Sequence, residues 1–229
     1  MKVQRLRVRY SLGPEARGLG QRDLALAWGD VLKAAGLPLS YSEGRRRSAQ
    51  LAIGAPLPQG VTSDCELMDA VMESYIPVSD ILTRISPYLP AGIHALSIEE
   101  VGINLPSLQS QVRWAEYEVR LDAGVGDHLR EAICRTLEAT TLPSEYRRER
   151  KVREYDMRPL ILGLRVCADD DRVIVMRLRA EPERTARADL VAAALGLPED
   201  APIHRTRLVL EEVPSIVLAQ RRQPGLPED

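Results

Sequence analysis

Apolar and polar residues alternate along the first ten residues of the chain. One side of an extended chain would carry arginines and the other side large apolar residues, namely Arg5, Arg7 and Arg9 against Leu6, Val8 and Tyr10. A period of two residues is typical of a β-strand with one buried face. The chain therefore predicts a strand over residues 2–10 whose outer face is basic.

The periodicity then changes several times before residue 101. Helical spacing of apolar residues predicts helices over 24–35 and 78–87, and strand patterns cover 49–54, 64–75 and 92–101. Gly36 and Pro38 end the first of these helices. The resulting order is β-α-β-β-α-β, which is the split motif of ferredoxin-like folds.

The second half of the chain repeats this order of elements. Strand patterns cover 111–121, 157–167, 172–179 and 202–211, and helical patterns cover 127–139 and 185–195. The polar segment 143–156 predicts a long loop. We therefore predict an α+β fold of two tandem ferredoxin-like halves, residues 1–104 and 105–215, joined near 102–110. Residues 216–229 are predicted to be a flexible tail.

Helices cover one face of a β-α-β-β-α-β sheet and leave the other face open. Period two assigns eight arginines to the open faces: Arg5, Arg7, Arg9, Arg165, Arg177, Arg179, Arg205 and Arg207. Such ladders have two interpretations. They form a phosphate-binding surface, or they pair with glutamates on neighbouring strands. Trp114, Tyr10 and Tyr117 are the aromatic candidates for base stacking on these strands.

Composition and charge place the chain among soluble globular proteins. Of 229 residues, 45% are hydrophobic and 28% charged, with a formal net charge of −2. Residues 1–50 carry ten basic and four acidic side chains, whereas residues 51–110 carry one and seven. The net charge of the whole chain therefore conceals a basic segment at residues 1–50. The sequence contains no apolar run of membrane-spanning length and no signal segment, and its three cysteines favour a cytoplasmic protein without membrane contact.

Two loop segments concentrate the cations. Arg45, Arg46 and Arg47 follow Gly44, and Arg147, Arg148, Arg150 and Lys151 lie in the polar segment 143–156. Nearly all are arginines, whose planar guanidinium suits phosphate. These seven residues, extended by Arg5, Arg7 and Arg9, are the predicted RNA- or phosphate-binding set. A solvated loop is the alternative interpretation.

The sequence offers little for catalysis or metal binding. His94, His128 and His204 are scattered, and Cys65, Cys134 and Cys167 lack metal-ligand spacing, which predicts buried, small apolar cysteines. No phosphate-loop, dinucleotide or hydrolase motif is present. We expect no catalytic residue, no metal and no cofactor. Asp23 fits a helix-dipole partner or cap.

Taken together, several segments resemble the uncharacterised radical-SAM-linked protein family. They are residues 5–10, Gly13-Pro14, Arg17, Asp23-Leu24, 35–44, 56–61, 89–93, 115–119, Lys151, 156–161 and 204–206. The family-pattern residues of unassigned role are Asp23, Tyr41, Gly44, Asp156 and Arg158. Two family histidines are absent, because Gly20-Gln21-Arg22-Asp23 replaces Ser-His-Leu-Asp and 45–49 replaces Phe-Asn-Pro-His-Pro.

The resemblance implies a radical-SAM protein as partner. The favoured hypothesis is a non-catalytic accessory module that presents RNA or another anion to that partner. One alternative is a metal-independent endoribonuclease, by fold-level similarity to the RAMP proteins that process RNA. The other is a protein–protein adaptor that binds no nucleic acid.

Overall fold

The first half of the chain forms a four-stranded antiparallel sheet with its helices on one face. A computed structural model describes residues 2–43, 47–148 and 151–211, with side chains described outside 146–153. The elements of this half are β1 (Gln4–Leu12), α1 (Gln21–Ala34), β2 (Leu51–Ile53), β3 (Thr62–Met72), α2 (Ile81–Ile85) and β4 (Ile93–Val101). The strand order is β4-β1-β3-β2, and every neighbouring pair is antiparallel.

The second half has an equivalent strand order. Its main elements are β5 (Val112–Arg120), α4 (Asp127–Glu138), β8 (Ile161–Val166), β9 (Val173–Glu181), α5 (Ala188–Ala194) and β11 (Ile203–Leu210). The order is β8-β9-β5-β11, again antiparallel throughout. A two-residue strand, β10 (Arg184–Thr185), also pairs with β9. Thr185 therefore belongs to a strand, and the predicted helix begins only at Ala188.

The polar segment 143–156 differs from the prediction of a loop. It forms an antiparallel hairpin of β6 (Pro143–Arg148) and β7 (Lys151–Asp156), which pair only with each other. The hairpin is inserted between α4 and β8, where the first half has no counterpart.

The two halves share a single sheet. Strand β11 runs parallel to β3 and pairs with it at only two positions, His204 with Thr62 and Arg205 with Ser63. This junction joins all main strands into a nine-stranded mixed sheet. The structure confirms an α+β fold. The division into two tandem ferredoxin-like units stays a prediction, because the sheet is continuous, and the predicted tail 216–229 lies outside the described residues.

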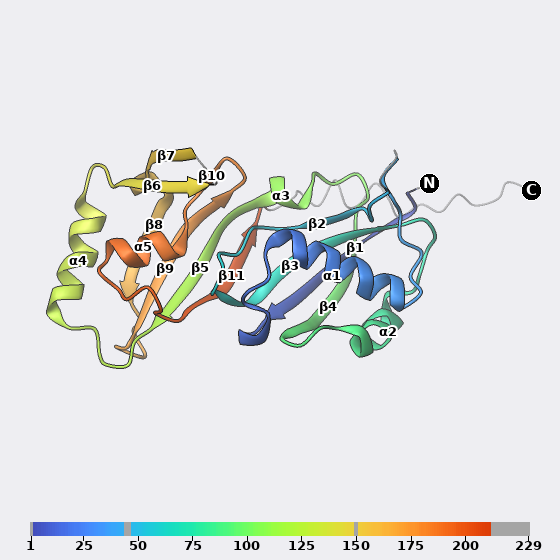
Figure 1. The fold of residues 1–229 in the computed structure, drawn as a ribbon, viewed down its shortest axis with the longest axis horizontal. Helices are drawn as coiled ribbons and strands as arrows, with labels where there is room; N and C mark the ends of the chain where they lie inside the picture. The colour runs from blue at the N-terminus through green and yellow to red at the C-terminus, as the bar shows by residue number, and fades with distance from the viewer. Residues whose placement is uncertain (1, 44–46, 149–150, 212–229) are drawn as a thin grey trace, which may run out of the picture.

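Both halves carry a helix on the same side of the sheet, as Figure 1 shows for α1 and α5. The buried side of α1 consists of Leu24, Trp28, Val31 and Leu32, which pack on alternate residues of β1 and β3. A second apolar core lies under α4 and α5. The opposite side of the sheet is called the open face below.

Short helices complete the chain. They are α3 (Leu108–Gln111) in the connection between the halves and the 3-10 helices Pro14–Ala16, Val78–Asp80, Ser86–Tyr88 and Arg158–Leu160. The predicted helix 78–87 is thus one turn of α-helix flanked by 3-10 turns. Across the described ranges, none of the helices has the length and apolar character that crossing a bilayer requires.

Candidate functional site

Two of the three arginines of β1 are buried, which corrects the prediction of an exposed ladder. Arg5 and Arg7 are each 7% exposed and share the carboxylate of Asp69, which is 2% exposed. The Nε atoms of Arg5 and Arg7 donate to the two carboxylate oxygens, each at 2.8 Å. Arg9 alone remains exposed on this strand.

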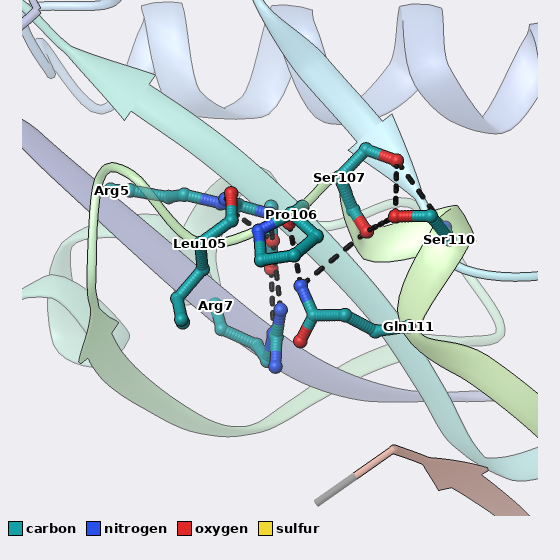
Figure 2. Close-up of polar contacts among 8 residues, drawn as sticks. Arg5, Arg7, Leu105, Pro106, Ser107, Ser110 and Gln111 are labelled. Carbon is teal, nitrogen blue, oxygen red and sulfur yellow. Dashed lines mark hydrogen bonds and ion pairs between the residues drawn. The ribbon is translucent and has the colours of Figure 1, made fainter. Parts of the chain in front are cut away.

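The connection between the halves covers this part of the open face. Arg5 donates through Nη1 to the carbonyl of Leu105 at 2.9 Å and through Nη2 to that of Pro106 at 3.0 Å (Figure 2). Gln111, which is 2% exposed, also donates to the Pro106 carbonyl. Arg5 therefore holds the connection in place, and Arg7 shares the Asp69 carboxylate with it, so we assign both a structural role.

Arg205 is also buried, and on the opposite side from the prediction. A register irregularity between Arg205 and Arg207 separates the two side chains, so that Arg205 faces the helices. It is 0% exposed, forms an ion pair with Glu66 at 2.9 Å, and donates to the Tyr117 hydroxyl at 3.2 Å. The expected ladder of β11 thus reduces to Arg207.

The remaining exposed arginines lie on the open face of neighbouring strands. We define the arginine face as Trp114 and Glu116 of β5, Arg165 of β8, Arg177 of β9 and Arg207 of β11. The four charged side chains among them are exposed or half-buried. Glu116 pairs in register with Arg177 on one side and Arg207 on the other, so the sheet places these groups in one row.

Trp114 contacts two guanidinium groups. The Cζ atoms of Arg177 and Arg207 are 4.5 Å and 5.3 Å from the ring centroid. Cation–π contact holds a guanidinium over a ring and leaves its N–H edge free to bind an anion. Glu116 lies 3.5 Å from Arg177, so it offsets only part of the positive charge of the row.

A shallow hollow of about 200 Å³ adjoins this row. Arg165 and Arg177 line it together with Glu116, Leu162 and Gly163. Gly163 pairs with Arg177, and its missing side chain leaves room beside the guanidinium. The arginine face therefore offers two cations around a depression that would admit a small anionic group such as a phosphate.

The predicted basic loops are only partly described. Gly44, Arg45, Arg46 and Arg150 lie outside the described residues, and Arg47 is exposed. Arg147, Arg148 and Lys151 lie on the β6–β7 hairpin, where the backbone places Arg148 directly opposite Lys151. Like charges at opposed positions destabilise a hairpin unless a counter-charge binds.

The family-pattern residues have local structural roles. The carboxylate of Asp23 accepts from the Gly20 amide at 3.4 Å and caps α1, as predicted. Asp156 accepts from the amides of Leu142 and Arg158, and Arg158 donates to the carbonyls of Leu137 and Ile161. These contacts fasten the hairpin to α4 and β8. Tyr41 is 37% exposed and its backbone forms a bridge to Ala49.

The cysteines do not form a common site. Cys65 is buried, as predicted, whereas Cys134 is exposed and Cys167 half-buried. Burial raises the pKa of the Cys65 thiol from 9.0 to about 11. Within the residues that the structure describes, no three histidine, cysteine or acidic side chains are grouped as metal ligands.

One family description matches most of the chain. Residues 5–188 match "Uncharacterized protein conserved in bacteria (DUF2344)". No curated protein matches significantly. Among solved structures, a Cbf5-Nop10-Gar1 complex matches at 14% identity and TM-score 0.43, covering 90% of this chain and 50% of that chain. An archaeal box H/ACA sRNP Nop10-Cbf5 complex gives 14% and 0.42, covering 93% and 50%. The chain spans about half the length of these structures.

Proposed function

This chain belongs to the DUF2344 family, and we propose that it is a non-catalytic module that binds the phosphate backbone of RNA. The arginine face is the observation that carries this proposal. Its cations are exposed, Arg177 and Arg207 lie in one row, and both of these contact the Trp114 ring. Guanidinium groups that are already ordered lose less conformational entropy when they bind an anion.

The same contacts argue for binding with little sequence preference. Proteins that read single-stranded bases stack them on free aromatic rings. Here Arg177 and Arg207 already occupy positions over the Trp114 ring. The arginine face therefore presents N–H donors to phosphates. The Trp114 ring is already covered by arginines and is not free to stack on a base.

The basic loops would add further phosphate contacts. We propose that Arg45, Arg46, Arg47, Arg147, Arg148, Arg150 and Lys151 bind phosphate, with Arg9 as an additional cation of the open face. The backbone of the hairpin supports this, because its register pairs Arg148 with Lys151 and so brings two basic residues to neighbouring positions. Arg5 and Arg7 are left out of this set, since Asp69 and the 105–106 carbonyls already bind them.

We also propose a radical-SAM protein as the partner to which the RNA is presented. The sequence resemblance supports this partner. An adaptor that binds the partner without nucleic acid is the competing proposal, and the binding experiment separates the two.

The test is the salt dependence of RNA binding. A fluorescent 12-nucleotide oligouridylate is titrated in EDTA at several salt concentrations. The Arg177→Gln/Arg207→Gln variant should lower the slope of log K against log salt by about 1.4, since each neutralised phosphate contributes about 0.7 on single strands. Arg45, Arg46 and Arg47 replaced by Ala should lower it by about 2.

The matched control removes two charges from another surface. Arg130→Gln/Arg135→Gln on α4 changes the net charge equally and should leave the slope unchanged. Absence of binding at low salt by a folded, monodisperse sample would favour the adaptor. Shortening of the RNA in EDTA would favour the endoribonuclease alternative.

A further inference from the structure

A second hollow lies on the helix side of the sheet, away from the arginine face. It is a cleft of about 1060 Å³ between the two halves. The first half contributes Gln21, Gly54 and residues 56–59. The rest of the chain contributes Gln109, Tyr117 and residues 154–156, 159–160, 180 and 182–187. Clefts between structural units are a common place for small-molecule sites.

We infer that this cleft binds an uncharged planar lactam ring, the chemistry of the bases of uridine and inosine. The inference does not depend on phosphate binding at the arginine face. It rests on a hydrogen-bond donor on a residue that lines the cleft, amide side chains in the lining, and a lining in which three carboxylates stand against two arginines.

The hydrogen-bond donor is the hydroxyl of Tyr117. The residue is 3% exposed and lines the cleft. Its oxygen already accepts from Nε of Arg205 at 3.2 Å, and among the described residues no acceptor is bonded to its hydrogen. A buried hydroxyl that keeps an unused hydrogen favours a ligand that brings an acceptor, such as a carbonyl oxygen.

Arg205 fixes the orientation of this hydroxyl. Its Nη2 donates to the Pro56 carbonyl at 2.8 Å, and its Nη1 donates to Glu66 at 2.9 Å. The guanidinium also lies 5.3 Å from the Tyr117 ring centroid. Because Arg205, Glu66 and Tyr117 are all buried, the donor position is set before any ligand enters.

The walls and the rim suit a flat amide-containing ring. Four prolines, Pro56, Pro58, Pro159 and Pro182, stiffen the apolar walls. Gln21 of α1, Gln59 of the turn before β3 and Gln109 of α3 line the cleft, so three separate segments bring carboxamides to it. Each carboxamide carries both a donor and an acceptor, which matches the alternating donor and acceptor edge of a lactam ring.

The charges around the cleft disfavour an anion. Glu154, Asp156 and Glu183 line it, against Arg184 and Arg187. Arg187 forms an ion pair with Asp189 at 2.5 Å. Phosphate would therefore bind on the arginine face, and the cleft would take an uncharged group. That group has two sources, a free nucleoside or an unpaired base of a bound RNA.

Inosine and adenosine form the matched pair of probes, because a ring carbonyl of inosine replaces an amino group of adenosine. Isothermal titration should show that inosine and uridine bind more tightly than adenosine. Tyr117→Phe should weaken inosine binding about three- to tenfold, the effect of one neutral hydrogen bond. It should leave adenosine unchanged. Tyr75→Phe, at a residue that is 64% exposed outside the cleft, is the control.

Tyr117→Phe also removes the acceptor of the Arg205 Nε–H group and could change the structure, so a second variant is needed. Gln59→Ala lies at an exposed rim position and should also weaken inosine binding, without a change in melting temperature. Equal affinity for inosine and adenosine, or no binding of inosine and uridine at millimolar concentration, would overturn the inference.

Competition separates the two sources. If the ligand is an RNA base, oligouridylate should displace uridine from the wild type, and Tyr117→Phe should bind oligouridylate more weakly. If the ligand is a free nucleoside, uridine should bind equally well in the presence of oligouridylate. The Arg177→Gln/Arg207→Gln variant should bind uridine normally in either case. Loss of phosphate binding at the arginine face can therefore be told apart from loss of base binding in the cleft.

Discussion

At the scale of single residues, burial decides which arginines are available to a ligand. Arg5, Arg7 and Arg205 are arginines on strands, as are Arg177 and Arg207, and period two alone treats them alike. What separates them is that Arg5, Arg7 and Arg205 are buried beside the buried carboxylates of Asp69 and Glu66, whereas Arg177 and Arg207 are exposed.

Only part of the candidate site could therefore be predicted from the sequence. Alternation placed Arg177 and Trp114 on strands, and it did so because neighbouring residues in a strand face opposite sides. It could not reveal the register that puts Trp114 in contact with Arg177 and Arg207, or the irregularity that turns Arg205 into the core. Register depends on contacts between segments that lie about 60 to 100 residues apart.

Cys65 gives a prediction at this scale. Burial raises the pKa of its thiol to about 11, so the group keeps its proton in the folded protein at pH 8. Iodoacetamide should modify the exposed Cys134 first and Cys65 only after unfolding, as measured by peptide mass spectrometry. Equal rates at the two cysteines in folded protein would contradict the assignment.

The same shift has a consequence for stability. A thiol whose folded pKa exceeds the ordinary value of 9.0 stabilises the fold fully below pH 9. That contribution is lost as the pH rises from 9 to about 11. Comparison with Cys65→Ala in urea at pH 8 and pH 11 should show the wild type losing its advantage.

At the scale of elements, periodicity located most helices and strands because their apolar faces are buried. Periodicity did not predict the β6–β7 hairpin, because its polar sequence shows no alternation and its strands pair only with each other. The helices and strands predicted in the first half of the chain begin and end within a few residues of the observed ones. For example, the helix predicted over 24–35 is α1 (Gln21–Ala34).

Gly92, at the turn before β4, tests a close backbone approach. Its φ is +78°, and a Cβ atom there would lie 2.8 Å from the Ala16 nitrogen. Gly60 has φ +86° and nothing within 4 Å of such an atom. Gly60→Ala should cost about 1–2 kcal/mol from the left-handed conformation alone, and Gly92→Ala should cost more. Urea denaturation measures the free energy of unfolding of both variants. Equal losses would show that the loop at Ala16 moves away from the added methyl group without cost.

At the scale of the whole molecule, the two halves depend on one short junction. Strands β3 and β11 share two paired positions, and the buried Arg205–Glu66 ion pair crosses the same place. His204 adds contacts to Thr62 at 2.7 Å and Asp64 at 2.9 Å. We expect this junction to make both halves unfold together.

Arg205→Met tests the junction. It leaves the Glu66 carboxylate buried without its partner, which should cost about 3–5 kcal/mol. Calorimetry should show one transition for the wild type and two for the variant, because the halves lose their link. Arg113→Met breaks an exposed pair with Glu211 and should cost about 0–1 kcal/mol. Similar losses in both variants would show that the junction lies elsewhere.

The strand at the end of the sheet, β4, bears on how the protein behaves at high concentration. One edge of β4 pairs with β1, and its other edge forms no ladder with another described strand. Such an edge can recruit strands from other molecules and start aggregation. Two features of β4 oppose this: the register irregularity opposite Arg9 and Tyr10, and the exposed carboxylates of Glu99 and Glu100. We therefore expect these features to disfavour pairing of this edge with other copies of the chain at high concentration.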